Sequence, residues 1–208
     1  MDFFEVIANR RSIRKYTDEP VPEEDIKRMI EAATLAPSAH NSKPWRFVVV
    51  RNREVIKKLV EVVHHWMDEV LKSPRVPDDL KEHYNKYRPY FTFYENAPVV
   101  IVVCGVPYES VPGKAVSLAF PEKAKASKVN SMEQSVSAAI ENLILAATAL
   151  GYGSCWATGP LLAAEDMKKI LSLPPEWEIM ALVPIGKPLK NPVPKKPQPI
   201  EEVAIFID

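Results

Sequence analysis

Hydrophobic residues along the chain switch between two patterns, a helical spacing of three or four positions and short continuous runs. The helical spacing predicts amphipathic helices, whereas the continuous runs predict strands with both faces covered. Three predicted helices cover residues 53–71, 130–150 and 163–171. Three others are predicted after Asp2, between Pro22 and Pro37, and after Asp78. The predicted strands cover 45–50, 99–104, 154–157, 178–183 and 203–207. Because helices and strands are mixed throughout, we predict one α+β domain over residues 1–208, with a central mixed β-sheet flanked by helices.

Boundary residues support two of these helices. Pro22 suits the first helical position, where its missing N–H is of no consequence. Asn130 can cap the helix that follows it, and Glu133 stands three residues on, as in a capping box. Gly151 is then the expected stop of that helix.

Three stretches lack a clear period. Residues 73–94 mix prolines, tyrosines and charges, and we expect a loop, a short helix and an aromatic approach to the next strand. Residues 107–128 are expected to form a mobile excursion that could act as a lid. Six prolines between Pro184 and Pro199 exclude a helix or a central strand, which predicts an extended arm. This arm, ending in the predicted strand 203–207, is expected to dock on a partner subunit.

Composition narrows the class of protein. The 208 residues are 47% hydrophobic, and 27 basic residues balance 27 acidic ones, so no overall field attracts nucleic acid or an anionic membrane. Cys104 and Cys155 lie in apolar runs without metal-ligand spacing, which is typical of a reducing cytosol and predicts a cytoplasmic protein. The N-terminus has no signal-peptide pattern, and the longest apolar helix is interrupted by Glu141 and Asn142.

Common catalytic and phosphate-binding motifs are missing. The chain has no phosphate loop, nucleophile elbow or zinc-protease motif, and Gly151-Tyr152-Gly153 is too short for a dinucleotide fingerprint. His64 and His65 lie on a predicted helix without acidic or sulfur partners at ligand spacing, so no metal site is predicted.

The densest group of positive charges is Arg10, Arg11 and Arg14, with the neutral Ser12 among them. Three guanidinium groups and a hydroxyl can hold a phosphate through charge-assisted hydrogen bonds. A solvated charged face and a nucleic-acid contact are the alternatives at this point.

A second candidate is the polar loop over 38–42, between a helix and a strand. It offers small side chains, free amides and the Asn41 carboxamide, which can donate and accept at the edge of a planar heterocycle. The alternative is a purely structural turn.

Five stretches together resemble the nitroreductase family of FMN-dependent oxidoreductases. They are 10–16 (RRSIRKY), 36–47 (APSAHNSKPWRF), 97–99 (APV), 150–156 (LGYGSCW) and 183–186 (VPIG). The resemblance is weakest at 73–94 and at 107–128.

The resemblance implies a set of FMN contacts. The phosphate and ribityl chain would be held by Arg10, Arg11, Ser12 and Arg14. The other subunit would contribute Pro37, Ser38, Ala39 and Asn41. The isoalloxazine edge would face Ala157, Thr158 and Gly159. Where the family tends to place an arginine against the phosphate, this arm offers Lys195 or Lys196.

The resemblance also implies a homodimer with FMN at its interface. NADH or NADPH would reduce the flavin, and a nitroaromatic, quinone or similar small acceptor would then oxidise it in the same pocket. The flavin carries out the hydride transfer, so no catalytic side chain is required. The alternatives are a reductive dehalogenase or flavin-consuming enzyme of the same fold, a non-catalytic flavin-binding dimer, and a basic-loop nucleic-acid binder.

Overall fold

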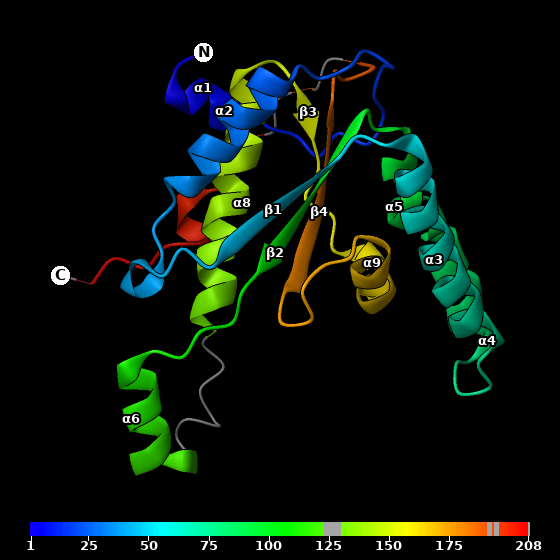
Figure 1. Ribbon diagram of the computed structural model, residues 1–208. Coiled ribbons are helices and arrows are strands. Elements are labelled where there is room, and N and C mark those ends of the chain that lie inside the picture. The colour runs from blue at the N-terminus through cyan, green and yellow to red at the C-terminus, as the bar shows by residue number, and fades with distance from the viewer. Residues whose placement is uncertain (123–129, 191–192, 194–195, 208) are drawn as a thin grey trace.

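The computed structural model describes residues 1–122, 130–190, 193 and 196–207, and its centre is a four-stranded sheet. The strands are β1 (Trp45–Val50), β2 (Val99–Gly105), β3 (Gly153–Ser154) and β4 (Glu178–Gly186), in the order β1-β2-β4-β3 (Figure 1). Their pairings are antiparallel, and the parallel component is an isolated bridge between Ser12 and Ser154. The predicted α+β class is confirmed.

Helices cover both faces of this sheet (Figure 1). One face is packed by α2 (Glu23–Thr34) and α8 (Ser131–Ala149), and the other by α3 (Arg53–Lys72), α5 (Arg88–Thr92) and α9 (Ala164–Ile170). The side chains of β2 alternate between the two cores, Ile101 on the α8 face and Val102 on the α3 face. Because every residue of β2 is buried, its sequence shows no polar alternation.

The remaining described elements are short. They are α1 (Phe3–Asn9), η1 (Ala39–Asn41), α4 (Asp78–Lys86), η2 (Phe93–Asn96), α6 (Val111–Ala119), η3 (Gly159–Ala163) and η4 (Ile200–Glu202). Among the helices described, none is both long and apolar enough to cross a membrane.

The predicted caps are largely confirmed. The Asn130 side chain accepts from the Glu133 backbone N–H at 3.1 Å and donates to the Glu133 carboxylate at 2.7 Å. Asp2 and Glu5 form a capping box at α1. Pro22 is the N-cap of α2 rather than its first helical residue.

The prediction of a fully buried strand at 45–50 was wrong. Trp45 and Val50 are buried, but Arg46 and Val49 are exposed, because β1 is an edge strand. A run of apolar residues does not reveal whether its strand has neighbours on both sides.

Two strand boundaries also differ from the prediction. The strand expected at 154–157 is Gly153–Ser154, and Ala157 forms only an isolated bridge to Leu182. Pro184 lies within β4, although we expected it to begin the arm. The Pro184 carbonyl accepts from the Tyr16 hydroxyl at 3.3 Å, so it points away from β2. The nitrogen and the carbonyl of one strand residue point to the same side, so the missing N–H of Pro184 also faces away from β2. The proline therefore removes no bond from the β2–β4 ladder.

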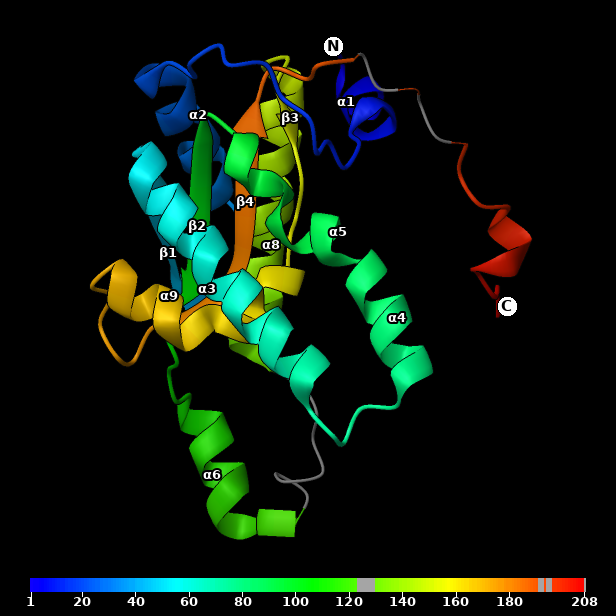
Figure 2. The same cartoon turned by 90° about the vertical axis from the view of Figure 1, so that its right-hand side faces the viewer.

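The predicted terminal strand at 203–207 is absent from the structure, where residues 200–202 form a single 3-10 turn. A strand needs a hydrogen-bonded neighbour, and the described chain offers none where this segment stands, away from the body (Figure 2). Its docking on a partner subunit stays a prediction.

The excursion predicted at 107–128 contains a helix that the pattern did not indicate. α6 begins with Ser110 as its cap and extends away from the sheet in both ribbon views (Figures 1 and 2). None of its residues is buried. Residues 123–128 of this stretch lie outside the described part of the chain.

Candidate functional site

The arginine segment leaves α1 and runs onto the edge of the sheet. The Arg10 N–H donates to the Val6 carbonyl at 2.9 Å, which ends the helix. Three residues later the Ile13 N–H donates to the Ser154 carbonyl at 2.8 Å. A Cβ on Gly153 would lie 2.8 Å from the Ile13 side chain, so a glycine is needed for this close approach.

This path brings together four of the predicted site residues. One hollow of about 360 Å³ is lined by Arg10, Arg11, Ser12 and Arg14, and we call it the arginine hollow. Among the ion pairs of the described residues, none involves these three arginines. Three unpaired guanidinium groups around one concavity can bind an anion.

Arg14 lies on aromatic rings that the sequence did not indicate. Its guanidinium carbon is 5.5 Å from the centre of the Tyr90 ring and 5.6 Å from that of Phe93. Both distances are within the range of a cation–π interaction. The rings come from α5 and η2, more than seventy positions away in the chain, so only the fold could reveal them.

Cys155 lies beside the arginine hollow and is buried. Burial raises the pKa of the Cys155 thiol above its ordinary value, while Arg14, a hydrogen bond from Ser12 and Arg10 act in the opposite direction. The net direction is upward, so the thiol stays neutral. A neutral thiol adds no negative charge to a hollow that would bind an anion.

Residues 157–159 follow shortly after β3, the edge strand beside the arginine segment. The Ala157 N–H and carbonyl each pair with Leu182 at 3.0 Å, which fixes the backbone midway along β4. Thr158 is exposed, and Gly159 opens η3. A Cβ on Gly159 would come 3.3 Å from the Phe91 ring, so this position is closely packed. Ala157, Thr158 and Gly159 therefore follow the arginine hollow along one edge of the sheet.

The helix-to-strand loop, residues 37–43, lines a second hollow, separate from the arginine hollow. Ser38 Oγ accepts from the Lys43 N–H at 3.0 Å, and the Ala39 N–H donates to Ser135 Oγ at 3.2 Å. A hollow of about 210 Å³ is lined by Pro37, Ser38, Ala39, Ser131, Gln134, Ser135 and Ala138. Asn41 is exposed beside it.

The backbone of this loop is strained. His40, Asn41 and Lys43 have φ values of 54°, 52° and 46°, in the left-handed region that non-glycine residues avoid. Each such residue costs roughly 1–2 kcal/mol, less for Asn. Strain of this kind clusters at binding sites, which favours the binding loop over the purely structural turn.

The loop and the arginine hollow lie at opposite ends of the sheet. Trp45, after the loop, pairs with Gly105, which in turn pairs with Glu178 at the start of β4. The arginine segment adjoins β3, whose Gly153 pairs with Gly186 at the end of β4. Eight residue steps at about 3.3 Å separate these ends by roughly 26 Å. One chain therefore does not bring the two groups of predicted residues together.

Of the two arm lysines, Lys196 is exposed and lines neither hollow, whereas Lys195 lies outside the described residues. Within the described ranges, no group of three His, Cys, Asp or Glu side chains could hold a metal ion. The described parts of the chain thus offer sites for an anion and for hydrogen bonding, but no metal centre.

The fold and the arginine hollow define a class of protein. It is an α+β protein in which a positively charged site for an anion lies at the edge of a helix-covered sheet. Comparison with known proteins then gives the family. A sequence profile described as "Nitroreductase family" matches residues 7–187. The chain belongs to the nitroreductase family of FMN flavoprotein oxidoreductases.

Three similar proteins illustrate the range of this family. A protein of Methanothermobacter thermautotrophicus named "Putative NADH dehydrogenase/NAD(P)H nitroreductase" is 35% identical over 92% of this chain and 80% of its own length. Iodotyrosine deiodinase 1 of Rattus norvegicus is 31% identical over 91% of this chain and 63% of its own length. The crystal structure of a BluB-like flavoprotein from Clostridium difficile has a TM-score of 0.91 and 33% identity, with 100% of both chains covered.

Proposed function

We propose that the protein is a homodimeric oxidoreductase that binds FMN, accepts a hydride from NADH or NADPH and passes it to a small-molecule acceptor. The observation that carries this proposal is the arginine hollow, in which Arg10, Arg11 and Arg14 pair with no carboxylate of the described residues. Three unpaired cations are opposite in charge to the FMN phosphate and can donate hydrogen bonds to it. Membership of the nitroreductase family supports the same cofactor.

The chain's own residues bind and orient the cofactor. Arg10, Arg11, Ser12 and Arg14 hold the phosphate and the ribityl chain. Ala157, Thr158 and Gly159 lie along the ring, and Ala157 fixes this stretch of backbone through its pairing with Leu182 of β4. When bound, FMN supplies the hydride chemistry, and the protein contributes position and fixed donors.

A second chain completes the site. Pro37, Ser38, Ala39 and Asn41 stand about one sheet length from the arginine hollow of their own chain, so they serve the flavin of the partner. The strained loop is then held by the dimer as well as by its own hydrogen bonds. Lys195 or Lys196 reaches the same phosphate from the C-terminal arm.

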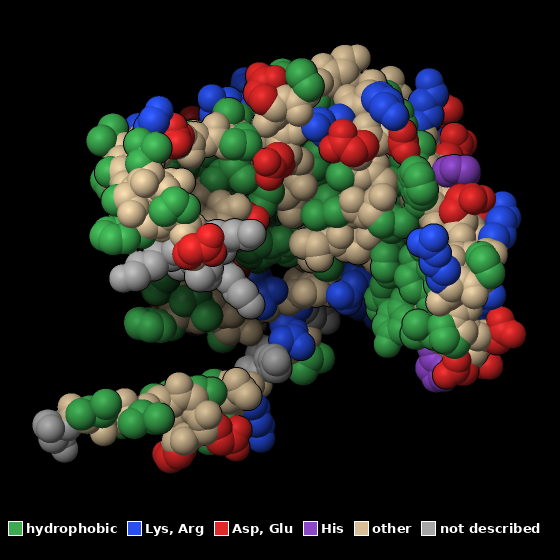
Figure 3. Space-filling view, turned by 90° about the horizontal axis from the view of Figure 1, so that it is seen from below, with side chains coloured by type: hydrophobic (Ala, Val, Ile, Leu, Met, Phe, Trp, Pro, Cys, Tyr) green, Lys and Arg blue, Asp and Glu red, His purple; other side chains and the backbone are tan. Residues whose placement is uncertain are grey.

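The exposed apolar surface of the C-terminal arm supports the dimer. The space-filling view shows hydrophobic side chains along a segment that projects from the body (Figure 3). These exposed side chains are Leu189, Val193, Ile200, Val203, Ile205, Phe206 and Ile207. A contiguous apolar surface of this kind marks an interaction site, and we assign it to a second copy of this chain.

Nitroaromatic compounds, quinones and similar acceptors are the first candidates for the second half-reaction, and the Methanothermobacter relative is named as a nitroreductase. Reductive dehalogenation is the second candidate, because the chain is 31% identical to a deiodinase. Two buried free cysteines, Cys104 and Cys155, are in keeping with a cytoplasmic enzyme.

The absorption spectrum of the purified protein tests this proposal. We expect a yellow protein that releases FMN on denaturation and bleaches when NADH or NADPH is added without oxygen. Reoxidation by a nitroaromatic or a quinone, compared with an iodinated tyrosine, then distinguishes the two candidate acceptors. A colourless protein that fails to bind added FMN would contradict the proposal. A yellow protein that neither nucleotide bleaches would be a flavin-binding dimer instead of an NAD(P)H oxidoreductase.

A further inference from the structure

Residues 88–96, which comprise α5 and η2, connect the two segments that face the flavin in the proposed site. We call them the aromatic platform. Tyr90 and Phe93 lie within 5.6 Å of the Arg14 guanidinium carbon, and Phe91 lies against Gly159. The same short piece of chain therefore contacts the phosphate end and the ring end of the site.

The two ends of the platform are held in different ways. At its C-terminal end Tyr94 is fully buried, and its hydroxyl donates to the Leu59 carbonyl of α3 at 2.9 Å. At its N-terminal end Tyr90 is 55% exposed, so packing holds this end less firmly. Tyr90 is one of the two rings beneath Arg14.

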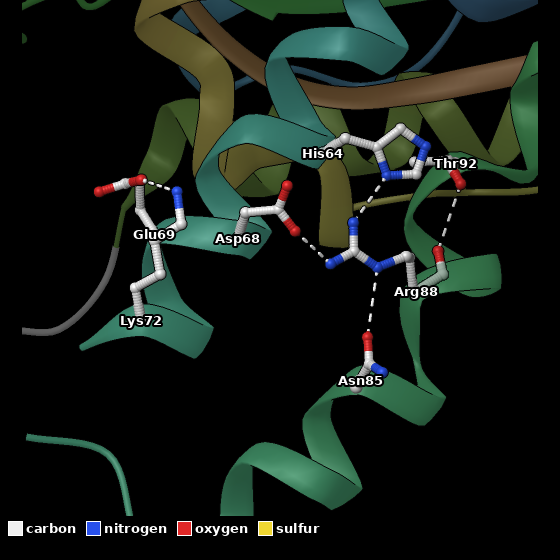
Figure 4. A network of polar contacts seen from close by, with 7 residues as sticks. All are labelled: His64, Asp68, Glu69, Lys72, Asn85, Arg88 and Thr92. Atoms are coloured by element: carbon white, nitrogen blue, oxygen red, sulfur yellow. Dashed lines mark hydrogen bonds and ion pairs between the residues drawn. The ribbon is translucent and has the colours of Figure 1, made fainter. Parts of the chain in front are cut away.

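Arg88 fastens this loosely packed end (Figure 4). Its guanidinium donates to Asp68 Oδ1 at 2.5 Å, to His64 Nδ1 at 3.1 Å and to Asn85 Oδ1 at 3.3 Å. Arginine can only donate, so His64 accepts through Nδ1 and carries its proton on Nε2. Asp68 and His64 belong to α3 and Asn85 to α4, so one side chain joins three helices.

The α3 end of this contact belongs to a helix that is packed against the sheet. On the sheet side of α3 the buried residues include Val63 and Met67, which flank His64 and Asp68 in the sequence. The hydrogen bond from Arg88 holds the pKa of Asp68 below its ordinary value, in keeping with a charged pair. Only 26% of the Arg88 side chain is exposed, so water screens this contact less than a surface pair.

We propose that Arg88 is a positioning residue for the FMN site. It fixes the N-terminal end of the aromatic platform against α3, and the platform then fixes Arg14 relative to Gly159. This inference rests on the proposed function, because it assumes that Arg14 contacts FMN. It predicts that losing Arg88 weakens FMN binding although Arg14 is still present.

The test compares FMN affinity in two matched variants, Arg88→Met and Lys86→Met. Lys86 is the control because it lies on the neighbouring helix α4 and pairs with Glu82 at 2.8 Å, away from the platform. FMN is titrated into apoprotein by fluorescence at a temperature well below unfolding. We expect the Kd of Arg88→Met to rise about tenfold and that of Lys86→Met to stay at the wild-type value.

A thermodynamic cycle with Arg14→Ala separates positioning from a general loss of stability. If Arg88 acts through Arg14, Arg88→Met adds less than about threefold to the Kd in the Arg14→Ala background. Full additivity, or an unchanged Kd in Arg88→Met, would overturn the inference. Wild-type protein that does not bind FMN would instead overturn the proposed function as a whole.

If Arg88→Met does not fold, Asp68→Asn and Tyr90→Leu take its place. Both side chains are substantially exposed, 50% for the Asp68 side chain and 55% for Tyr90, so the fold tolerates their loss. We expect a higher Kd for FMN in each. Wild-type affinity in both variants would contradict the positioning role.

Discussion

Arg14 combines charge and packing in one side chain. Its guanidinium has no carboxylate partner among the described residues, yet it lies on Tyr90 and Phe93. A flexible arginine held on two rings is already ordered before an anion arrives, so less conformational entropy is lost on binding.

Replacing Arg14 by Ala should therefore weaken FMN binding by about 10- to 100-fold. A hydrogen bond to a charged group contributes roughly 1.5–3 kcal/mol, which corresponds to this range. Fluorescence titration of FMN into apoprotein measures the effect. Arg28→Ala is the control, because Arg28 is an exposed arginine of α2 that pairs with Asp25. Equal affinity in the Arg14 and Arg28 variants would remove Arg14 from the phosphate site.

At the residue scale, the local sequence revealed the charges but not their surroundings. The cluster of Arg10, Arg11 and Arg14 is visible in five consecutive positions. Long-range contacts place the aromatic rings against Arg14 and the Cys155 thiol near it, and no local pattern contains such contacts.

The sequence indicated the loop over 38–42 but not the strain in its backbone, for another reason. The left-handed conformations at His40 and Lys43 occur in residues that rarely adopt them, and no glycine marks the place. Long-range hydrogen bonds, such as Ala39 N–H to Ser135 Oγ, help to hold this backbone, and no local pattern reveals them.

At the scale of elements, helices were predicted better than strands. Caps and helical spacing are local, so α1, α2, α3 and α8 could be placed to within a few residues. The exposure of β1 and the inclusion of Pro184 in β4 depend on which strands lie alongside, and this is decided by the fold as a whole. The expected strand at 203–207 has no neighbour in the described chain.

One contact joins α2 to the corner between α8 and β3, and it should depend on pH. The Tyr152 hydroxyl donates to Asp25 Oδ2 at 2.7 Å. Burial, together with the bond to Asp25, raises the pKa of Tyr152 to about 12. An unfolded tyrosine titrates near 10, so the folded protein retains this proton to higher pH.

The contribution of Tyr152 to stability should be complete below about pH 10 and should be lost as pH rises from about 10 to about 12. The free energy of unfolding in urea, measured from pH 8 to pH 11.5, would reveal this in a comparison of wild type with Tyr152→Phe. We expect the stability of wild type to fall more steeply than that of the variant above pH 10. Parallel curves would contradict the assignment. Tyr87→Phe, at an exposed position, is the control.

At the scale of the whole molecule, the arrangement of the site residues is the basis of the proposed dimer. The arginine hollow and the loop 37–43 stand at opposite ends of the sheet, and the C-terminal arm exposes apolar side chains. Both features are explained if a second copy contributes its loop to this flavin and receives this arm.

The arm should therefore stabilise the dimer. Ile205 and Phe206 are 90% and 81% exposed in one chain, and their burial in an interface would favour association by roughly 1.5–3 kcal/mol each. The double substitution Ile205→Asp with Phe206→Asp should weaken the dimer by at least about tenfold, as measured by sedimentation velocity over a range of concentrations. Glu201→Gln with Glu202→Gln is the control, because it changes charge on the same arm without removing apolar surface. Equal dimer affinity in the two variants would exclude these side chains from the interface.

The central claim is that each FMN is bound by the arginine hollow of one chain and the loop of the other. Mixing two inactive variants tests it most directly, one with Arg10→Ala and Arg14→Ala, the other with Ser38→Ala and Asn41→Ala. After unfolding and refolding together, half of the dimers contain one chain of each kind, and each mixed dimer has one intact site. We predict that FMN binding returns to about one quarter of the wild-type number of sites. No recovery from a mixture whose dimers have exchanged subunits would contradict the shared site.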